Sequence, residues 1–465
     1  MLSGVLSNEL LQVSELRYSS ARCRQRNTTP QGTTCKDSPV RFTEISAALA
    51  PPAGEPSAAS PSDPVGRERR FWDDVSARGT PLIDPCETDD DMRDVTFLYR
   101  STDPEVRSVR LVANRVTDKH REALGIMSRV PGTGVWGVTL PLPADLRCSY
   151  GFSPSTSDTP EPMGTGQRPG PPVVVDPYNI DPPLRRPDPL APHIGSSVFS
   201  GPLAPDHSMW SSAEAAPGTV ITDVREILGS TCQVDIYTPE SRSPEGLLVL
   251  FDGGEWFEGL DVARACEAAG LPPLAIMGVG TQGRAQRVST LGGNREFLRR
   301  VADELLPWIE DALTHQGCAL PQRARRIISG QSLGGLSSLL MALDSPTAFD
   351  AVLAHSSSLW WHPGGDATPA DLHHLSDDTW LTRQFSAASR PEAEFHLAVG
   401  SREDLMIDHT RRLSEVLEDK GCAVSLSIYQ GGHDFACWRG ALIDGLRSVF
   451  GQCSRSSVDG ESAQE

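Results

Sequence analysis

Apolar and polar residues alternate in short runs in the first half of the chain. Polar or Gly/Pro-rich turns separate four such runs, which are VTFLYR at 95–100, VRLVANRV at 109–116, VWGVTLPL at 135–142 and CSYGF at 148–152. Alternation over a few residues is typical of strands with one buried face. The pattern predicts a small antiparallel β-sandwich in this part of the chain.

The second half has a different pattern, with continuous apolar runs that end in glycines or polar residues. These runs are GLLVLFDGG, LAIMGVG, RRIISG, AVLAHSS, EFHLAVG and AVSLSIYQG. Uninterrupted apolar runs of this length are expected of parallel strands, which are buried on both faces.

Helical segments lie between these runs. NREFLRRVADELLPWIEDAL places large apolar residues on one helical face, namely Phe297, Val301, Leu305, Trp308 and Ile309. LGGLSSLLMAL and TRRLSEVLEDKG predict two further helices, the second ended by Gly421. Because strands and helices alternate, we expect an α/β domain with a mainly parallel sheet covered by helices.

These patterns divide the chain into four parts. Residues 1–68 include ISAALAPPAGEPSAASPSDPVG, which cannot bury much apolar surface, and we predict that they are disordered. Residues 69–205 are assigned to the β-sandwich domain, with a Pro-rich connector that starts at VVVDPYNIDPP and continues to about Pro217. Residues 206–455 are assigned to the α/β domain, and 456–465 to a disordered tail.

Composition excludes some classes of protein. The formal net charge of −19 argues against binding a nucleic-acid backbone through the overall field, although a local arginine cluster can still attract a small anion. No apolar run reaches the ~18 residues of a membrane span, so we expect no membrane partner. MLSGVLSNELLQVSEL lacks the basic start of a signal peptide, and the ten cysteines form no C-x-x-C pair. We therefore expect a cytoplasmic protein with reduced cysteines.

The strongest chemical signal is the G-x-S-x-G motif from Gly330 to Gly334, between a predicted buried strand and a predicted helix. In an α/β-hydrolase such a sharp turn exposes a nucleophilic serine, here Ser332, and the glycines avoid collisions within the turn. The alternative is a glycine-rich turn with an ordinary serine, which this strand–helix context disfavours. The motif predicts that the α/β domain is a hydrolase.

A serine nucleophile needs a base, which hydrolases of this fold supply after the last strands, in the chain order Ser, acid, His. Of eleven histidines, His433 directly follows the last predicted strand. The others considered fall in periodic or irregular segments: His315, His355, His396, His362, His373 and His374. His433 is therefore the predicted base, and a turn histidine is the alternative reading.

The orienting acid should follow the preceding strand, where HLAVGSREDLM offers Glu403 and Asp404. The residues alone leave this choice open. Asp434 is too close in sequence to His433 to orient it. For the oxyanion hole, we expect one backbone N–H from Leu333 and a second from Gly253 or Gly254.

Several segments resemble the enterochelin esterase family, which hydrolyses ferric enterobactin and related catecholate siderophores. In the second half these are GQSLGGL, SSSLWWH, GGHDFACWRGAL, FDGGEW and RVSTLGGNREF. FWDDVSARGTPLID, VTFLYR and GTGVWGVTLPL resemble the β-sandwich domain that precedes the hydrolase in this family. The similarity covers roughly residues 70 to 450. Arg287, Leu291 and Asn294 fit the family's pattern, whereas Thr290 stands where that pattern has glutamate.

The resemblance implies a cytoplasmic serine esterase that cuts the trilactone of ferric enterobactin or a related siderophore, with iron arriving as part of the substrate and no cofactor. It implies that Glu403 occupies the position of the acid. An esterase or acyltransferase acting on aryl or sugar esters, and a siderophore-binding protein without activity, are the alternatives.

A ferric tris-catecholate is anionic and aromatic, so its site calls for arginines and flat side chains. The predicted catalytic loops are flanked by Arg284, Arg287, Arg402 and Arg439, and they carry Trp256, Trp360, Trp361 and Trp438. The predicted substrate-binding residues are these four arginines together with Asn294, Trp360, Trp361 and Trp438. Core packing is the alternative for Trp438 and for one of the paired tryptophans.

Overall fold

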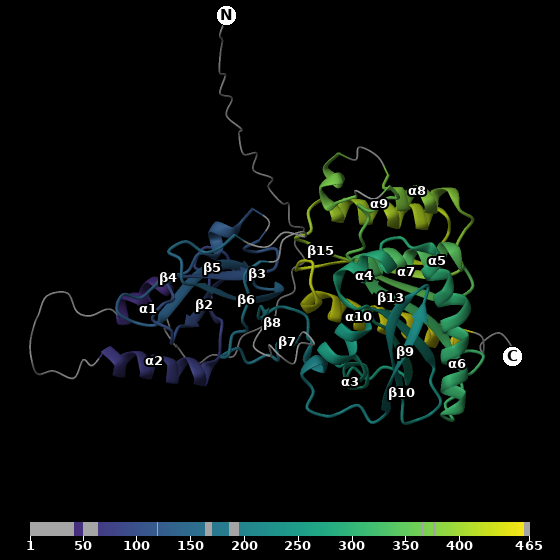
Figure 1. Ribbon diagram of the computed structural model, residues 1–465, viewed down its shortest axis with the longest axis horizontal. Helices are drawn as coiled ribbons and strands as arrows, with labels where there is room; N and C mark the ends of the chain where they lie inside the picture. The colour runs from purple at the N-terminus through teal and green to yellow at the C-terminus, as the bar shows by residue number, and fades with distance from the viewer. Residues whose placement is uncertain are drawn as a thin grey trace, which may run out of the picture. The chain divides into compact units, whose positions relative to one another are not determined.

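The computed structural model describes residues 41–49, 64–118, 120–162, 170–185, 195–364, 367–374 and 378–459. Figure 1 shows the strand-rich first part and the α/β second part of the described chain. No helix in these described ranges is long and apolar enough to cross a membrane. Most of the segment expected to be disordered, 1–40 and 50–63, lies outside the described residues.

Residues 82–200 form a β-sandwich of two four-stranded sheets. The first sheet has the order β1 (Leu82–Pro85), β2 (Met92–Arg100), β5 (Val135–Pro143) and β4 (Ser128–Arg129). The second has the order β3 (Ser108–Ala113), β6 (Arg147–Ser155), β8 (Gly195–Ser200) and β7 (Leu184–Arg185). All pairs are antiparallel, and the short helix η1 (Glu122–Gly125) follows β3. The alternating runs therefore predicted four of these strands correctly.

Two helices precede the sandwich, where disorder was predicted. Helix α1 (Phe42–Leu49) buries Phe42, Ile45 and Leu49, and α2 (Pro64–Arg78) buries Trp72 and Val75 in the same cluster. The Phe42 ring lies against Gly137 of β5, where a Cβ atom would come within 2.2 Å of the ring. The prediction of disorder is thus wrong for residues 42–49 and 64–68. Burying a few large side chains against Leu98, Val130 and Val135 stabilises these helices although the sequence around them is mostly polar.

The Pro-rich connector is partly built into the sandwich. Val174 pairs with Phe152 of β6, and the buried Asp176 accepts hydrogen bonds from Tyr150 and Thr80, both at 2.8 Å. Strand β8 then pairs with β6. The prediction of a simple connector is therefore wrong for these residues, because a proline-rich sequence can pair at a sheet edge.

Eight strands form the sheet of the α/β part, in the order β16-β15-β14-β13-β11-β12-β10-β9. Their bounds are β9 Thr219–Ile227, β10 Ser230–Thr238, β11 Gly246–Phe251, β12 Leu274–Val279, β13 Arg325–Gln331, β14 Ala351–His355, β15 Glu394–Gly400 and β16 Val424–Tyr429. Strands β11 to β16 are parallel to one another, as the apolar runs predicted. Strands β9 and β10 add an antiparallel hairpin that the sequence analysis did not identify.

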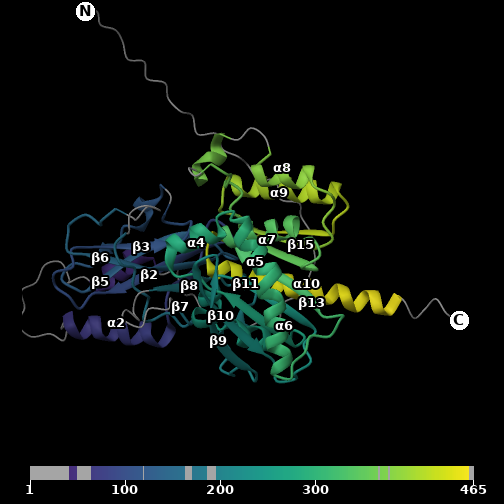
Figure 2. The same cartoon turned by 45° about the vertical axis from the view of Figure 1, so that its right-hand side comes forward.

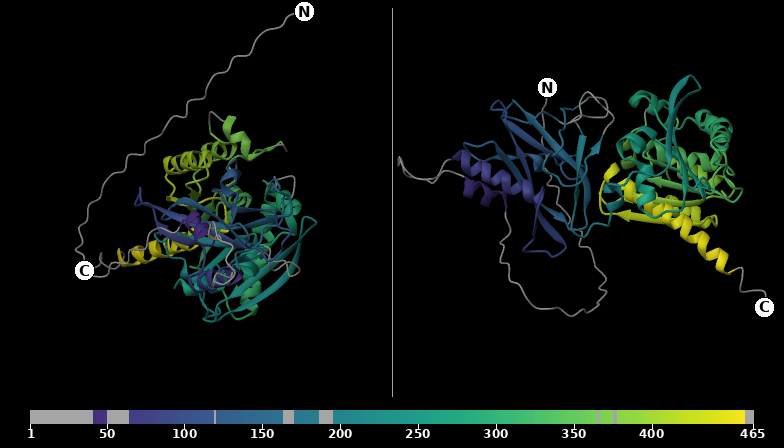
Figure 3. Two further views of the ribbon diagram at one scale, coloured as in Figure 1. Left: turned by 90° about the vertical axis from the view of Figure 1, so that its left-hand side faces the viewer. Right: turned by 90° about the horizontal axis from the view of Figure 1, so that it is seen from below.

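Helices cover both faces of this sheet (Figures 1 and 2). On one face, Leu247, Val249 and Phe251 pack with α5 (Arg295–Arg300), α6 (Leu306–His315), α7 (Leu333–Asp344), α8 (Trp380–Ala387) and α9 (Leu405–Asp419). On the other, Leu248 and Leu250 pack with α3 (Val262–Ala268) and α10 (Phe435–Asp459), the long yellow helix in Figure 3. Helix α10 includes residues 456–459, which were assigned to the disordered tail.

The remaining elements are short. They are α4 (Gly283–Leu291), η2 (Ser208–Ser211), η3 (Glu255–Gly259), η4 (Val301–Leu305) and η5 (Pro369–His374). The predicted apolar stripe at 297–309 is buried except for Trp308, whose ring is partly exposed and lies 3.8 Å from the Arg225 guanidinium. Gly421 follows α9 with φ of +76°, so the predicted helix stop is confirmed.

Candidate active site

Ser332 lies in the turn between β13 and α7. It has φ of 56° and ψ of −118°, a conformation that non-glycine residues rarely adopt. The turn is so tight that a Cβ atom on Gly330 would lie 2.3 Å from the backbone of Gly334. The Ser332 N–H donates to the carbonyl of His355 at 3.0 Å, which fixes the turn against β14. The strained turn thus places the Ser332 hydroxyl directly before the N-terminus of α7, a helix of twelve residues.

His433 and Glu403 form a close pair at the ends of neighbouring strands. His433 Nδ1 lies 2.6 Å from Glu403 Oε2, and the side chains are 28% and 0% exposed, respectively. Burial raises the pKa of Glu403, but hydrogen bonds from His433, Ser356 and the Gly400 N–H outweigh it, so this pKa lies below its ordinary value. The carboxylate is therefore held ionised beside the imidazole.

Asp404, the other candidate acid, points elsewhere. Its side chain is 62% exposed and pairs with Arg115 at 3.7 Å, and the residue precedes α9. The geometry thus favours Glu403 over Asp404 as the partner of His433.

The loop after β14 links the two halves of the site through serines to which the sequence analysis gave no role. Ser356 Oγ donates to Glu403 at 2.5 Å and accepts from the Trp438 indole at 2.9 Å. Ser358 Oγ lies 3.3 Å from Ser332 Oγ, and its N–H donates to the Ser332 carbonyl. In this structure the Ser332 hydroxyl is thus paired with Ser358 and not with His433. Catalytic hydrogen bonds are often long or unformed before substrate binds.

The loop after β11 provides the other wall. Asp252 has φ of +61°, and Gly253 packs so closely on Gly278 that a Cβ atom would lie 2.6 Å from its backbone, whereas the space around Gly254 is open. No contact described for Gly253, Gly254 or Leu333 tests their expected role in the oxyanion hole, which stays a prediction.

A set of charged and polar side chains braces that loop. Arg287 donates two hydrogen bonds to the buried Asp252 carboxylate, at 2.6 and 2.8 Å. Gln331 also donates to Asp252, at 2.5 Å, and its carbonyl accepts from Arg287 at 3.3 Å. The brace therefore ties the expected oxyanion loop to the residue before Ser332. Asp252 lies in FDGG and Gln331 in GQS, but the sequence alone did not show that these two segments are in contact.

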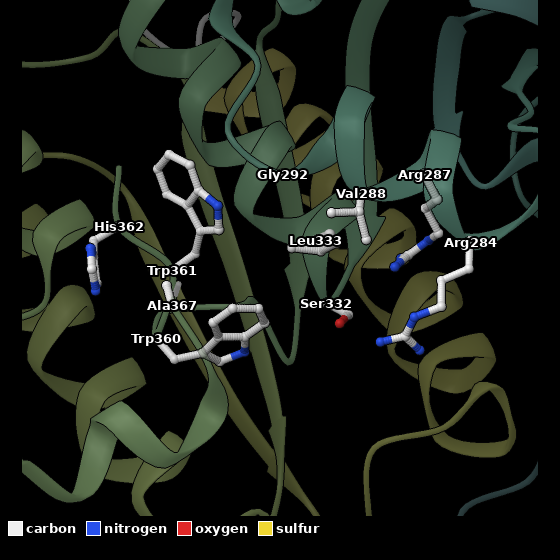
Figure 4. A pocket seen from close by; sticks show the side chains of 10 residues that line it. All are labelled: Arg284, Arg287, Val288, Gly292, Ser332, Leu333, Trp360, Trp361, His362 and Ala367. Atoms are coloured by element: carbon white, nitrogen blue, oxygen red, sulfur yellow. The ribbon is translucent and has the colours of Figure 1, made fainter. Parts of the chain in front are cut away.

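A pocket of about 270 Å³ opens beside Ser332. Figure 4 shows Trp360 and Trp361 on one side of Ser332 and Arg284 and Arg287 on the other. The remaining lining residues are Val288, Gly292, Leu333, His362 and Ala367. Arg284 is exposed, while Trp361 covers Gly293 and meets Trp380 edge to face at 5.0 Å. The structure thus brings four of the predicted substrate-binding residues into one pocket with Ser332.

Other predicted substrate-binding residues lie away from the pocket lining. Asn294 caps α5, accepting from the Phe297 N–H at 3.0 Å and donating to the Ser289 carbonyl at 2.9 Å. Arg402 donates to the Arg115 carbonyl at 3.4 Å and so lies against the sandwich. Thr290, at the position where the family's pattern has glutamate, is buried, and its hydroxyl donates to the Gln286 carbonyl of its own helix. The Thr290 side chain therefore does not line the pocket.

Three residues near catalytic loops are buried instead of facing a ligand. Trp438 is 5% exposed and packs edge-on against His433, with ring centroids 4.9 Å apart. Arg439 is 6% exposed, and burial lowers its pKa to about 10. Trp256 is fully buried. The substrate-binding predictions for Trp438 and Arg439 are therefore wrong: both belong to the inward-facing start of α10.

Fold and site together define a class: a carboxylic ester hydrolase of the α/β-hydrolase fold, preceded by a β-sandwich domain. Residues 225–449 match the family described as putative esterase, and residues 94–210 match the family described as enterochelin esterase, N-terminal. The chain belongs to the enterochelin esterase family.

Three relatives support this family. An iron(III) salmochelin esterase of Escherichia coli O6:H1 is 35% identical over 82% of this chain and 93% of its own. An iron(III) enterobactin esterase of Dickeya dadantii is 30% identical over 85% of this chain and 97% of its own. The crystal structure of the Shigella flexneri enterobactin esterase in the presence of 2,3-dihydroxy-N-benzoyl-serine is 25% identical, with a TM-score of 0.66, over 83% of this chain and 98% of its own.

Proposed function

We propose that this protein is a serine esterase that hydrolyses the ester bonds of a catecholate siderophore of the enterobactin or salmochelin type, or of its ferric complex. The observation that carries the proposal is the position of Ser332, in a pocket between a tryptophan pair and Arg284, on a chain 35% identical to a salmochelin esterase. The ligand present with the Shigella flexneri protein is a dihydroxybenzoyl-serine, which is the repeating unit such a substrate would release.

In the proposed acylation step, Ser332 Oγ attacks the ester carbonyl while His433 Nε2 takes its proton. Glu403 accepts the Nδ1–H hydrogen bond, which fixes the tautomer and stabilises the imidazolium. The carbonyl oxygen becomes an oxyanion facing the N–H of Leu333 and that of Gly253 or Gly254. As the C–O bond breaks, His433 donates the proton to the leaving seryl oxygen of the substrate, which becomes a free hydroxyl.

Deacylation repeats these events with water. His433 removes a proton from the water, whose oxygen attacks the acyl-enzyme, and then returns the proton to Ser332 as the ester bond breaks. The products are a carboxylic acid and free enzyme. No cofactor takes part in this chemistry, and iron is carried by the substrate.

Recognition is proposed to rest on local charge and on aromatic surface. Catecholate groups coordinated to iron carry negative charge, so the exposed guanidinium of Arg284 would attract them against the chain's net charge of −19. The flat face of Trp360 would stack on a catechol ring. We further expect the reaction in the cytoplasm, because the seven cysteines of the described residues are free thiols and six of them are buried.

Chromatography of products from iron-loaded and iron-free enterobactin-like trilactones tests the proposal. We expect linear products that disappear with the Ser332→Ala variant. A p-nitrophenyl ester serves as the comparison substrate. Cleavage of that ester with neither trilactone cut would leave a serine esterase but contradict the siderophore assignment.

A further inference from the structure

The catalytic base is held by a side chain from the other domain. Asn114, in the turn after β3 of the sandwich, accepts a hydrogen bond from the His433 N–H at 3.0 Å and donates one to the His433 carbonyl at 3.2 Å. The two residues are 319 positions apart. One amide thus satisfies both main-chain polar groups of His433.

This contact requires a close approach of the two backbones. A Cβ atom on Gly432 would lie 2.4 Å from Asn114 Oδ1 and 2.5 Å from Arg115 Cγ. Glycine is therefore the residue that lets the loop of His433 reach the turn of the sandwich.

Residues on either side of His433 are also fixed by the sandwich. The Asp434 carboxylate accepts from the Ser149 N–H at 2.9 Å and from its hydroxyl at 2.7 Å. The Arg147 N–H donates to the Gln430 carbonyl at 3.0 Å. His433 follows β16, an edge strand with a sheet partner on one side only, so these contacts replace support that the sheet does not give.

The same turn reaches the loop of the acid. The Arg115 carbonyl accepts from Arg402 at 3.4 Å, and the Arg115 guanidinium pairs with Asp404 at 3.7 Å. Arg402 and Asp404 flank Glu403 in the sequence. The turn at Asn114 and Arg115 therefore contacts both loops that carry the His433–Glu403 pair.

We propose that Asn114 is a positioning residue for the catalytic base, so that the β-sandwich domain completes the active site of the hydrolase. The inference rests on the proposed role of His433 and deepens it. Asn114 touches neither the substrate nor the reacting atoms. It acts by fixing the backbone that aims the imidazole, and small displacements of a catalytic group cost large factors in rate.

The full-length Asn114→Leu variant keeps nearly the same shape but removes both hydrogen bonds. Its control is Asn179→Leu in the same domain, because the side chain of Asn179 donates to Thr80, Tyr150 and Val198 and accepts from the Asp181 N–H, all within the sandwich part of the chain. On p-nitrophenyl acetate we expect Asn114→Leu to lower kcat about 10- to 100-fold, with KM within about twofold. Labelling of Ser332 by a fluorophosphonate should slow in parallel. Asn179→Leu should lower the melting temperature and leave kcat near that of the wild type.

Gly432→Ala tests the contact from the other side and covers the case in which Asn114→Leu does not fold. We expect a similar fall in kcat, and losses in the double variant that are less than additive, because both changes break one contact. A kcat within twofold of the wild type in either folded single variant overturns the proposal. Ser332→Ala and His433→Ala are measured beside them: activity retained by His433→Ala would overturn the assignment of the base itself.

Discussion

His433 and Glu403 differ sharply in exposure although their side chains are 2.6 Å apart. The imidazole is 28% exposed and the carboxylate is fully buried. Tyr429, at 3.4 Å, joins Ser356 and the Gly400 N–H around the Glu403 oxygen that His433 does not use. An acid sealed in this way can orient a base without reaching solvent or substrate.

The choice of acid is tested by a matched pair of amide substitutions. Glu403→Gln removes the charge that stabilises the imidazolium, and kcat should fall by about 10²- to 10⁴-fold. Asp404→Asn changes an exposed carboxylate one residue away, and kcat should stay within about twofold of the wild type. Steady-state kinetics on a simple ester measures both. The opposite ranking would make Asp404 the acid.

A second pair of substitutions concerns the nucleophile. Ser332→Ala should lower kcat by at least about 10⁴-fold, because no other group can form the acyl-enzyme. Ser358→Ala removes only the hydroxyl that pairs with Ser332 in this structure, so its kcat should change by less than about tenfold. Burst kinetics and fluorophosphonate labelling distinguish the two. Labelling of Ser332→Ala at the wild-type rate would place the nucleophile elsewhere.

The pocket wall is tested with two substrates. Arg284→Ala and Trp360→Ala should raise KM for an iron-loaded trilactone about 10-fold or more, through the loss of charge and stacking, and leave KM for p-nitrophenyl acetate unchanged. Trp361→Ala should also lower the melting temperature, since Trp361 packs on Gly293 and Trp380. Equal effects on both substrates would mean that the wall shapes the catalytic centre instead of recognising the siderophore.

Arg287 lines the pocket but also donates two hydrogen bonds to Asp252. Kinetics can distinguish a role in bracing the loop from a role in binding the substrate. If the brace is its function, Arg287→Ala should lower kcat on every substrate about 10-fold or more, by loosening the oxyanion loop. It should also lower the melting temperature, by leaving the Asp252 carboxylate buried without its cation. Arg287→Lys should be intermediate, because it keeps the charge but not the two parallel hydrogen bonds. A rise in KM for the ferric substrate alone would instead indicate direct contact with the ligand.

Burial beneath the nucleophile predicts a pH dependence of stability. His355 is 1% exposed, and burial, together with His396, lowers its pKa to about 3. A histidine that is neutral when folded and protonated when unfolded stabilises the protein fully above its ordinary pKa of about 6.5. That stability falls by roughly 1.4 kcal/mol per pH unit as the pH drops from there toward 3.

Urea titrations between pH 7.5 and 4.5 measure this slope. In His355→Phe the slope of unfolding free energy against pH should be smaller by about 1.4 kcal/mol per pH unit, because the unfolded chain then binds one proton fewer. Equal slopes in the wild type and His355→Phe would contradict the prediction.

The sequence predicted the parts of the site that depend on the ends of strands. Ser332 and Glu403 each follow a continuous apolar run, and such runs are buried parallel strands whose carboxyl ends meet at one sheet edge. For this reason the predicted residues around Ser332 lie close together although they are distant in sequence.

The errors concern side-chain direction. Trp438 and Arg439 are five and six positions beyond His433, but they lie in α10, and only the packing of α10 on the sheet decides that they face inward. Asn294 fits the family's pattern, yet its amide caps a helix. Asn114 could not be found from the sequence, because it lies in no distinctive motif and its partner, His433, is 319 positions away in another domain.

Helix α1 has a practical consequence for where this chain can be shortened. A protein that begins at residue 69, the boundary the composition suggests, would lack Phe42, Ile45 and Leu49 and would leave the surface beside Gly137 uncovered. Uncovered apolar surface of this kind favours self-association. The useful starting point for a shortened enzyme is therefore before residue 41, so that Phe42, Ile45 and Leu49 of α1 stay packed in this cluster.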